Sequence, residues 1–256
     1  MSLSPDPLQT DSSIAAYLEE VVRIQSELLG NDLTALFLHG SLVQDDYRPG
    51  SSDIDILGAV SRPISAEQRS DLVARLKHET LRVPAHGLEL IRCKRDDLRA
   101  PTACVPYDFA LSTGQEWGLR VETEGATSDI LVHMQLCRQS GIALAGPAAS
   151  EVFGQVPCEW LRIGLLGELQ WHREDLQTNP TGQAIANAVL NAARSLQAAE
   201  TGTILSKTGG ALWWLSRWPQ DAAVAMAMDY RSGRTTKAPS LRLALEFVRS
   251  AIAAIQ

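Results

Sequence analysis

The sequence predicts an α+β fold, in which an N-terminal α/β unit is followed by an all-helical unit. Up to about residue 125, short apolar runs typical of buried strands alternate with helical segments. Beyond that point, the apolar segments have helical spacing. The chain has 256 residues, enough for two modest domains, which we place at residues 1–145 and 146–256.

The N-terminal unit opens with a polar segment, residues 1–13, that we expect to be irregular. A helix should follow and end at Gly30, because glycine is a common residue after the last helical turn. Ser65 and Gln68 have the spacing of a capping box and predict the start of a second helix. Period-two or short apolar runs predict strands at 34–40, 53–60 and 86–93 and a further strand or hairpin within 105–125.

The segments after residue 126 are separated by proline and glycine. Their apolar residues recur every three or four positions, which is typical of amphipathic helices. This pattern predicts helices at 128–141, 159–176, 181–202, 204–218 and 240–255.

The composition is that of a globular protein, with 45% apolar and 21% charged residues. A net charge of −7 disfavours nucleic acid as a partner and suits a small cation, although an acidic surface is also a common solubility device. The four cysteines are scattered, and neither a signal peptide nor a membrane-spanning apolar run is present. We therefore expect a cytoplasmic protein with reduced thiols.

Asp53 and Asp55 stand one residue apart on the apolar run "DIDILGAV". On a strand they would share a face, where two close carboxylates repel and require a cationic partner. A divalent cation fits, and Mg²⁺ prefers such oxygen ligands. A lone Asp-x-Asp on an exposed edge strand is the alternative interpretation.

The residues around this pair favour a phosphate ligand. Gly40 and Ser41 end the preceding apolar run and offer backbone N–H groups and a hydroxyl, and a glycine allows close approach. Ser52 adds a second hydroxyl. Glu89, between two leucines, is expected on the site-facing side of a third strand, as a metal ligand or a general base, unless it is simply an exposed glutamate.

The stretch "LFLHGSLVQDDYRPGSSDIDIL" resembles the Gly-Ser and Asp-x-Asp element of the DNA polymerase β-like nucleotidyltransferase superfamily. More narrowly, the chain is similar to the aminoglycoside (streptomycin/spectinomycin) adenylyltransferases. "GIALAGPAASEVFGQVP" resembles the segment that joins the two domains in that family, and "NAVLNAARSLQAAETGTILSKTGGALWWLSRWP" resembles its helical element. The resemblance covers roughly residues 33 to 230.

This resemblance implies a nucleotidyltransferase domain with a mixed sheet, then a helical bundle, with the site in the cleft between them. It implies Mg²⁺-dependent transfer of AMP from ATP to a hydroxyl of streptomycin or spectinomycin, and hence antibiotic resistance. The implied roles are magnesium binding by Asp53, Asp55 and Glu89, general-base catalysis by Glu89, and nucleotide binding by Gly40, Ser41, Ser52, Arg194, Lys207 and Tyr230.

The drug-binding part of the resemblance is thinner. The segment "TNPTGQAIA" before Asn187 contains neither an acidic nor an aromatic residue, whereas the family has them there. Helical aromatics also often belong to the core. The residues that could take this role are Trp117, Trp171, Glu174 and Asp175.

Two other functions stay open. The chain could transfer a nucleotide to a different small molecule or to a protein hydroxyl, or it could bind nucleotide without turnover. The complete set of Asp53, Asp55 and Glu89 argues against the second. For the adenylyltransferase implied by the resemblance we expect a monomer whose substrate is a small cationic aminoglycoside, with no nucleic-acid or membrane partner.

Overall fold

The computed structural model describes residues 12–256 and divides into two compact units, Met1–Gln155 and Val156–Gln256. The expected irregular opening segment lies almost entirely outside the described residues. The division falls ten residues beyond the predicted boundary at 145, because residues 146–155 stay with the first unit. The ring of Phe153, only 2% exposed, lies 4.8 Å from that of Phe37 in the first unit.

The first unit contains a six-stranded mixed sheet with the order β6-β5-β3-β2-β1-β8 and a separate two-stranded sheet of β4 and β7. Strands β2 and β3 are parallel, and the other neighbours are antiparallel. The strands are β1 (Leu33–His39), β2 (Ile54–Val60), β3 (Leu88–Lys94), β4 (Val105–Tyr107), β5 (Phe109–Gly114), β6 (Gly118–Glu122), β7 (Gly125–Thr127) and β8 (Ile142–Ala145).

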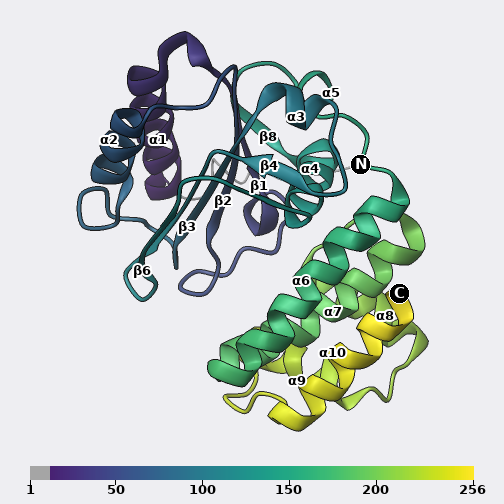
Figure 1. Ribbon diagram of the computed structural model, residues 1–256. Coiled ribbons are helices and arrows are strands. Elements are labelled where there is room, and N and C mark those ends of the chain that lie inside the picture. Colours follow the sequence, from purple (N-terminus) through teal and green to yellow (C-terminus); the bar gives the residue numbers. More distant parts are fainter. Residues whose placement is uncertain (1–11) are drawn as a thin grey trace, which may run out of the picture. The chain divides into compact units, whose positions relative to one another are not determined.

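Helices cover both faces of this sheet (Figure 1). Helices α1 and α2 pack their apolar side chains against β1, β2 and β3 to form the main core of the unit. Helix α4 contacts β1 and β2, and α3 contacts β3 and α5. The helices are α1 (Ser12–Leu29), α2 (Ala66–Leu76), α3 (Arg95–Arg99), α4 (Asp129–Ser140) and α5 (Ala149–Val152), with short 3-10 turns η2 (Gly30–Asp32) and η3 (Gly40–Leu42).

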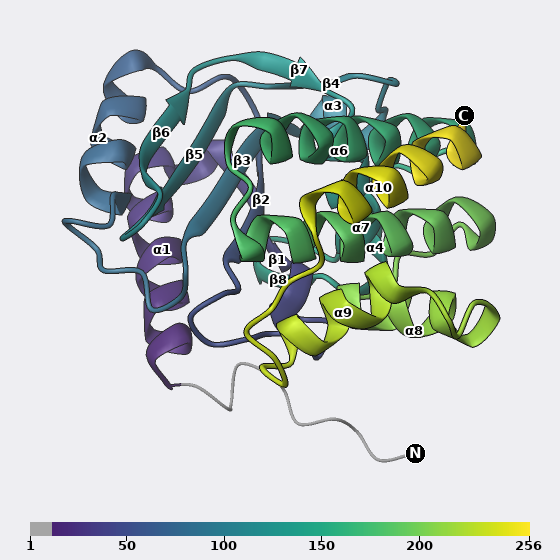
Figure 2. The same cartoon turned by 90° about the horizontal axis from the view of Figure 1, so that it is seen from below.

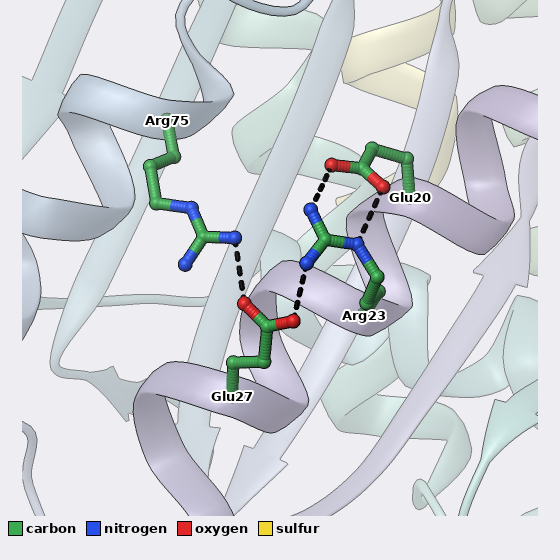
Figure 3. A network of polar contacts seen from close by, with 4 residues as sticks. All are labelled: Glu20, Arg23, Glu27 and Arg75. Carbon is green, nitrogen blue, oxygen red and sulfur yellow. Dashed lines mark hydrogen bonds and ion pairs between the residues drawn. The ribbon is translucent and has the colours of Figure 1, made fainter.

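The predicted start of α2 is confirmed in detail. The Ser65 hydroxyl accepts a hydrogen bond from the Gln68 backbone N–H, and the Gln68 side chain accepts one from the Ser65 N–H at 2.9 Å. An ion-pair network then links α2 to α1 (Figure 3). Arg75 on α2 contacts Glu27 at 2.8 Å, and Arg23 pairs with both Glu27 and Glu20 along α1. The hydrogen bonds from Arg75 and Arg23 lower the pKa of Glu27.

The second unit is a bundle built around α7, which contacts the four other helices (Figure 2). Close packing is possible because α7 is rich in buried alanine, and because a Cβ on Gly210 of α8 would lie 2.5 Å from the Arg194 Cα. Helix α9, which was not predicted, completes the core. The helices are α6 (Cys158–Thr178), α7 (Gly182–Thr201), α8 (Lys207–Arg217), α9 (Ala222–Arg231) and α10 (Leu241–Ile255). Within the part of the chain described, no helix is long and apolar enough to span a membrane.

Candidate active site

Asp53, Asp55 and Glu89 form an acidic cluster on one face of the mixed sheet. Each offers a carboxylate oxygen, and these oxygens all lie within 4.8 Å of one another. Asp53 immediately precedes β2, and Asp55 pairs with Glu89 across the parallel strands β2 and β3. All three residues are half-buried. The expected convergence of three carboxylates from neighbouring strands is present.

Strand alternation explains why the carboxylates share this face. Ile54 and Ile56 flank Asp55, Leu88 and Leu90 flank Glu89, and each of these four apolar side chains is at most 1% exposed. They face the core formed with α1 and α2. Because successive side chains on a strand point to opposite faces, Asp55 and Glu89 are directed away from that core.

Gly40 brings the backbone directly against the acidic cluster. It follows β1, whose last residue His39 pairs with Asp55, and it has a φ of +75°. A Cβ at Gly40 would lie 2.0 Å from the Asp55 Oδ2. The next residue, Ser41, has a buried hydroxyl oxygen with no hydrogen-bond partner in the described chain. A buried hydroxyl of this kind is available for a ligand oxygen.

Ser52 lies beside the cluster and is only 4% exposed. Its hydroxyl oxygen accepts a hydrogen bond from the Arg48 backbone N–H at 2.9 Å. Its carbonyl accepts one from the His86 N–H at 3.0 Å. Ser52 therefore holds the loop before β2 in place, and its hydroxyl proton is the group it could offer to a phosphate.

Helix α4 places a histidine behind the acidic cluster, a feature that the sequence did not reveal. The His133 Nε2 lies 2.9 Å from the Asp129 Oδ2, and its ring centroid is 4.9 Å from that of His39. Burial alone lowers the pKa of His133, but Asp129, together with Asp55 and Glu89, outweighs burial and raises this pKa from 6.5 to about 9. Asp55 also adds to the burial that raises the pKa of Cys137 on the same helix. His133 is thus a cationic group beside the carboxylates.

Trp117 lies in the turn between β5 and β6 and belongs to the same unit as the acidic cluster. A Cβ on Gly87 would lie 2.5 Å from its ring, so the indole packs directly on the backbone two residues before Glu89. The His86 ring contacts it edge-on at 5.2 Å. Trp117 is nevertheless 36% exposed, which leaves part of the ring open to a ligand.

The three nucleotide-binding candidates of the helical unit have different surroundings. Arg194 is buried on α7, where its guanidinium contacts the Glu168 carboxylate at 2.7 Å. Lys207 is the first residue of α8. The Tyr230 hydroxyl lies 2.8 Å from where a Cβ of Gly182 would stand, at the start of α7. Glu168 was not predicted, since nothing in the sequence pairs it with Arg194.

The remaining substrate candidates lie on α6. Trp171 is 56% exposed, its ring contacts that of His172 at 4.9 Å, and the Glu174 side chain is 71% exposed. Asp175 is half-buried near the end of the helix. Residues three and four positions apart share a face of a helix, so these three candidates lie on the same side of α6.

A glycine-serine turn beside paired strands that carry three carboxylates is an arrangement that suits nucleotidyl transfer. Comparison with known proteins agrees. The family model described as "Aminoglycoside adenylyltransferase, C-terminal domain" matches residues 151–254. An aminoglycoside (3'') (9) adenylyltransferase from Klebsiella pneumoniae is 30% identical over 219 residues, which cover 81% of this chain and 80% of that protein. The chain belongs to the aminoglycoside adenylyltransferase family.

More distant relatives extend the similarity. A spectinomycin 9-adenylyltransferase from Staphylococcus aureus is 24% identical over 211 residues, or 79% of this chain and 78% of that protein. The crystal structure of the spectinomycin adenyltransferase AAD(9) from Enterococcus faecalis, solved with ATP and spectinomycin, has a TM-score of 0.75. That match covers 93% of this chain and 99% of the other at 15% identity, so it shows the fold alone.

Proposed function

We propose that the protein transfers AMP from ATP to a hydroxyl of streptomycin or spectinomycin, with Mg²⁺ as cofactor, and thereby confers resistance. The observation that carries this proposal is the acidic cluster, whose carboxylate oxygens lie within 4.8 Å of one another beside the backbone of Gly40. The relatives named as aminoglycoside and spectinomycin adenylyltransferases support the acceptor class.

The residues of the acidic cluster fit a magnesium ion. Their carboxylate oxygens are hard ligands of the kind that Mg²⁺ shares with substrate phosphates. Three carboxylates at this spacing also repel one another, and a divalent cation among them would relieve that repulsion. Asp53, Asp55 and Glu89 would hold the ion. When bound, Mg²⁺ neutralises charge on the nucleotide phosphates.

The protein side chains contribute placement and proton transfer. Gly40 and Ser41, with the hydroxyl of Ser52, bind phosphate oxygens, and Glu89 accepts the proton of the acceptor hydroxyl. The acceptor oxygen then forms a bond to the α-phosphorus while the bond from that phosphorus to the β-phosphate oxygen breaks. Pyrophosphate leaves, and no covalent enzyme intermediate is needed.

The helical unit supplies the other proposed nucleotide contacts, which rest on the family resemblance. Arg194 and Lys207 bind the triphosphate, and Tyr230 lies against the nucleotide. The guanidinium of Arg194 has several N–H donors, so it can bind a phosphate oxygen while it keeps its contact with Glu168. Arginine is well suited to this role because its fork matches phosphate geometry.

Trp117 is the one acceptor-binding candidate that belongs to the same unit as the acidic cluster. Its ring packs on Gly87, two residues before Glu89, and remains partly exposed. An exposed indole is a suitable surface for a cationic amino sugar. Trp171, Glu174 and Asp175 of the helical unit are proposed as further acceptor contacts, because carboxylates attract the cationic groups of the drug.

A second candidate is the same transfer to a different small molecule or to a protein hydroxyl. It is favoured by one observation: the first turn of α7 contains no acidic residue. The net charge of −7 still argues against nucleic acid as the acceptor.

One assay separates these candidates. The protein is incubated with labelled ATP, Mg²⁺ and a panel of aminoglycosides, and pyrophosphate release is measured. Release that depends on streptomycin or spectinomycin is expected. Tight ATP binding without release in the presence of any drug would contradict the proposed acceptor and favour the second candidate or a protein that binds nucleotide without turnover.

Substitution Glu89→Gln tests the general base. Turnover should fall about 100-fold or more, while ATP affinity stays close to that of the wild type, because the amide cannot accept the proton. Single-turnover rates and equilibrium ATP binding measure the two effects. Glu124→Gln, an exposed glutamate of the same unit, is the matched control. A large loss of ATP affinity in Glu89→Gln would instead identify Glu89 mainly as a metal ligand.

A further inference from the structure

We propose that the first unit carries a second anion site, an arginine pocket that binds a small phosphate-bearing molecule. The pocket has a volume of about 520 Å³ and is lined by Arg95, Arg99 and Arg138, together with Ser150, Glu151 and Gln155. Two elements provide these arginines: α3 carries Arg95 and Arg99, and α4 carries Arg138. The remaining lining residues belong to α5 and the chain that follows it. None of them belongs to the acidic cluster.

The arginine pocket lies away from the proposed transfer site. Glu89 is the second residue of β3, whereas Arg95 follows the last residue of that strand. Six residues of extended chain span about 20 Å. An anion in the arginine pocket would therefore occupy the opposite end of β3 from the acidic cluster, and the two sites can be tested independently.

The walls of the pocket are held together by backbone contacts. The Gly154 N–H donates a hydrogen bond to the Leu98 carbonyl at 2.9 Å, and Arg138 donates one to the Phe153 carbonyl. A Cβ on Gly154 would lie 2.3 Å from the Arg99 carbonyl oxygen, so these segments are in direct contact. The buried ring of Phe153, directly after α5, holds this part of the chain in the core of the unit. The backbone walls of the pocket and the Arg138 side chain are thus held in place before a ligand binds.

The charges in the pocket are unbalanced. Three guanidinium groups face a single lining carboxylate, that of Glu151, in a chain whose net charge is −7. Among residues 12–256, no carboxylate lies within 4.0 Å of these guanidinium groups. The nearby Asp97 pairs instead with Lys94 at 3.4 Å. Arginines that are gathered in one place without a carboxylate partner attract an anion.

Phosphate is the anion that this geometry favours. A guanidinium fork donates two parallel hydrogen bonds to phosphate oxygens, and several forks around one space suit a group with more than one negative charge. The volume of about 520 Å³ exceeds that of a single phosphate and lies in the range of pockets for small organic ligands. We therefore assign the pocket to a diphosphate or a small phosphate ester.

The test uses the full chain in a low-salt buffer with EDTA, so that no divalent cation supports binding at the acidic cluster. Inorganic pyrophosphate and AMP are titrated by calorimetry into the wild type, Arg95→Gln, Arg99→Gln and the double variant. Arg120→Gln, an exposed arginine of the same unit, is the control. Each pocket substitution should weaken binding about tenfold, and the control should not.

Comparison of the two probes identifies the ligand. Tighter binding of pyrophosphate indicates a diphosphate ligand, and tighter binding of AMP indicates a phosphate ester. Either result supports the arginine pocket if the double variant no longer binds the probe. Saturable binding that is unchanged in Arg95→Gln/Arg99→Gln, or no saturable binding of either probe to the wild type, overturns the proposal. AMP transfer activity should be unaffected in these variants, which keeps this test separate from that of the proposed function.

Discussion

A methyl group on Gly40 would lie 2.0 Å from the Asp55 carboxylate. The backbone of Gly40 also has a φ of +75°, a conformation that residues with a side chain rarely adopt. Gly40→Ala should therefore both destabilise the protein and displace a proposed metal ligand. We expect a loss of stability beyond the roughly 1–2 kcal/mol of the backbone conformation alone, and a large loss of turnover. Urea denaturation and steady-state rates measure these effects.

Gly50 provides the control for this substitution. Its φ is +77°, nearly that of Gly40, but a Cβ there would meet no atom within 4 Å. Gly50→Ala should lower the free energy of unfolding only by the cost of the positive φ, and it should leave turnover unchanged. Equal losses of turnover in both variants would show that the contact with Asp55 is not the cause.

The ion-pair partner of Arg194 could not be predicted from the sequence. The position of Arg194 in an apolar helix correctly suggests that the cation needs an anionic partner. The partner in the structure is Glu168, 26 residues earlier on a different helix. Only the packing of α6 against α7 brings the two together, and a linear pattern does not contain that information.

At the scale of elements, helix α4 makes the stability of the protein depend on pH, because it carries His133 beside the acidic cluster. In metal-free protein the pKa of folded His133 is about 9, against 6.5 when unpaired, so the folded state keeps a proton that the unfolded state releases. The resulting stabilisation is complete below pH 6.5 and disappears as the pH rises to about 9. Stability should therefore fall with pH across this window.

Asp129→Asn tests this pH dependence, because it removes the carboxylate that contacts His133 at 2.9 Å. Urea midpoints measured in EDTA on both sides of the window should decline less with pH in Asp129→Asn than in the wild type. Asp71→Asn, on the exposed face of α2, should behave as the wild type. An Asp129→Asn curve parallel to that of the wild type would refute the contribution of His133.

The elements differ in how far their sequences predict them. The alternation in "DIDILGAV" and "HGLELIRC" predicts both the strands and the face that carries the carboxylates, because residue period and burial agree there. The strand β8, in contrast, lies within the stretch that the family resemblance assigns to the link between the domains, and it pairs with β1. Four residues are too few to show a period. Likewise, the helix at 128–141 was predicted, but its contact with the acidic cluster depends on tertiary packing.

At the scale of the molecule, each unit has a core of its own. The core of the helical unit consists of residues between Leu169 and Ile255 only. We therefore expect residues 156–256, expressed alone, to give a helical circular-dichroism spectrum and a cooperative thermal transition. Ala192→Asp, which buries an unpaired charge at a fully buried position, should abolish that transition in the same fragment. A fragment without a cooperative transition would show that this core is insufficient.

Strand pairing couples the chemistry of the acidic cluster to correct folding. Asp55 and Glu89 are direct neighbours because β2 and β3 align residue for residue, and apolar side chains occupy the positions on either side. A slip of β3 by one position would set a leucine beside Asp55 and turn Glu89 into hydrocarbon. Such a misaligned chain would lose both the proposed metal ligands and its apolar core. A conformer of this kind would be unstable as well as inactive. It should therefore not accumulate in the cell, because proteases remove unstable chains.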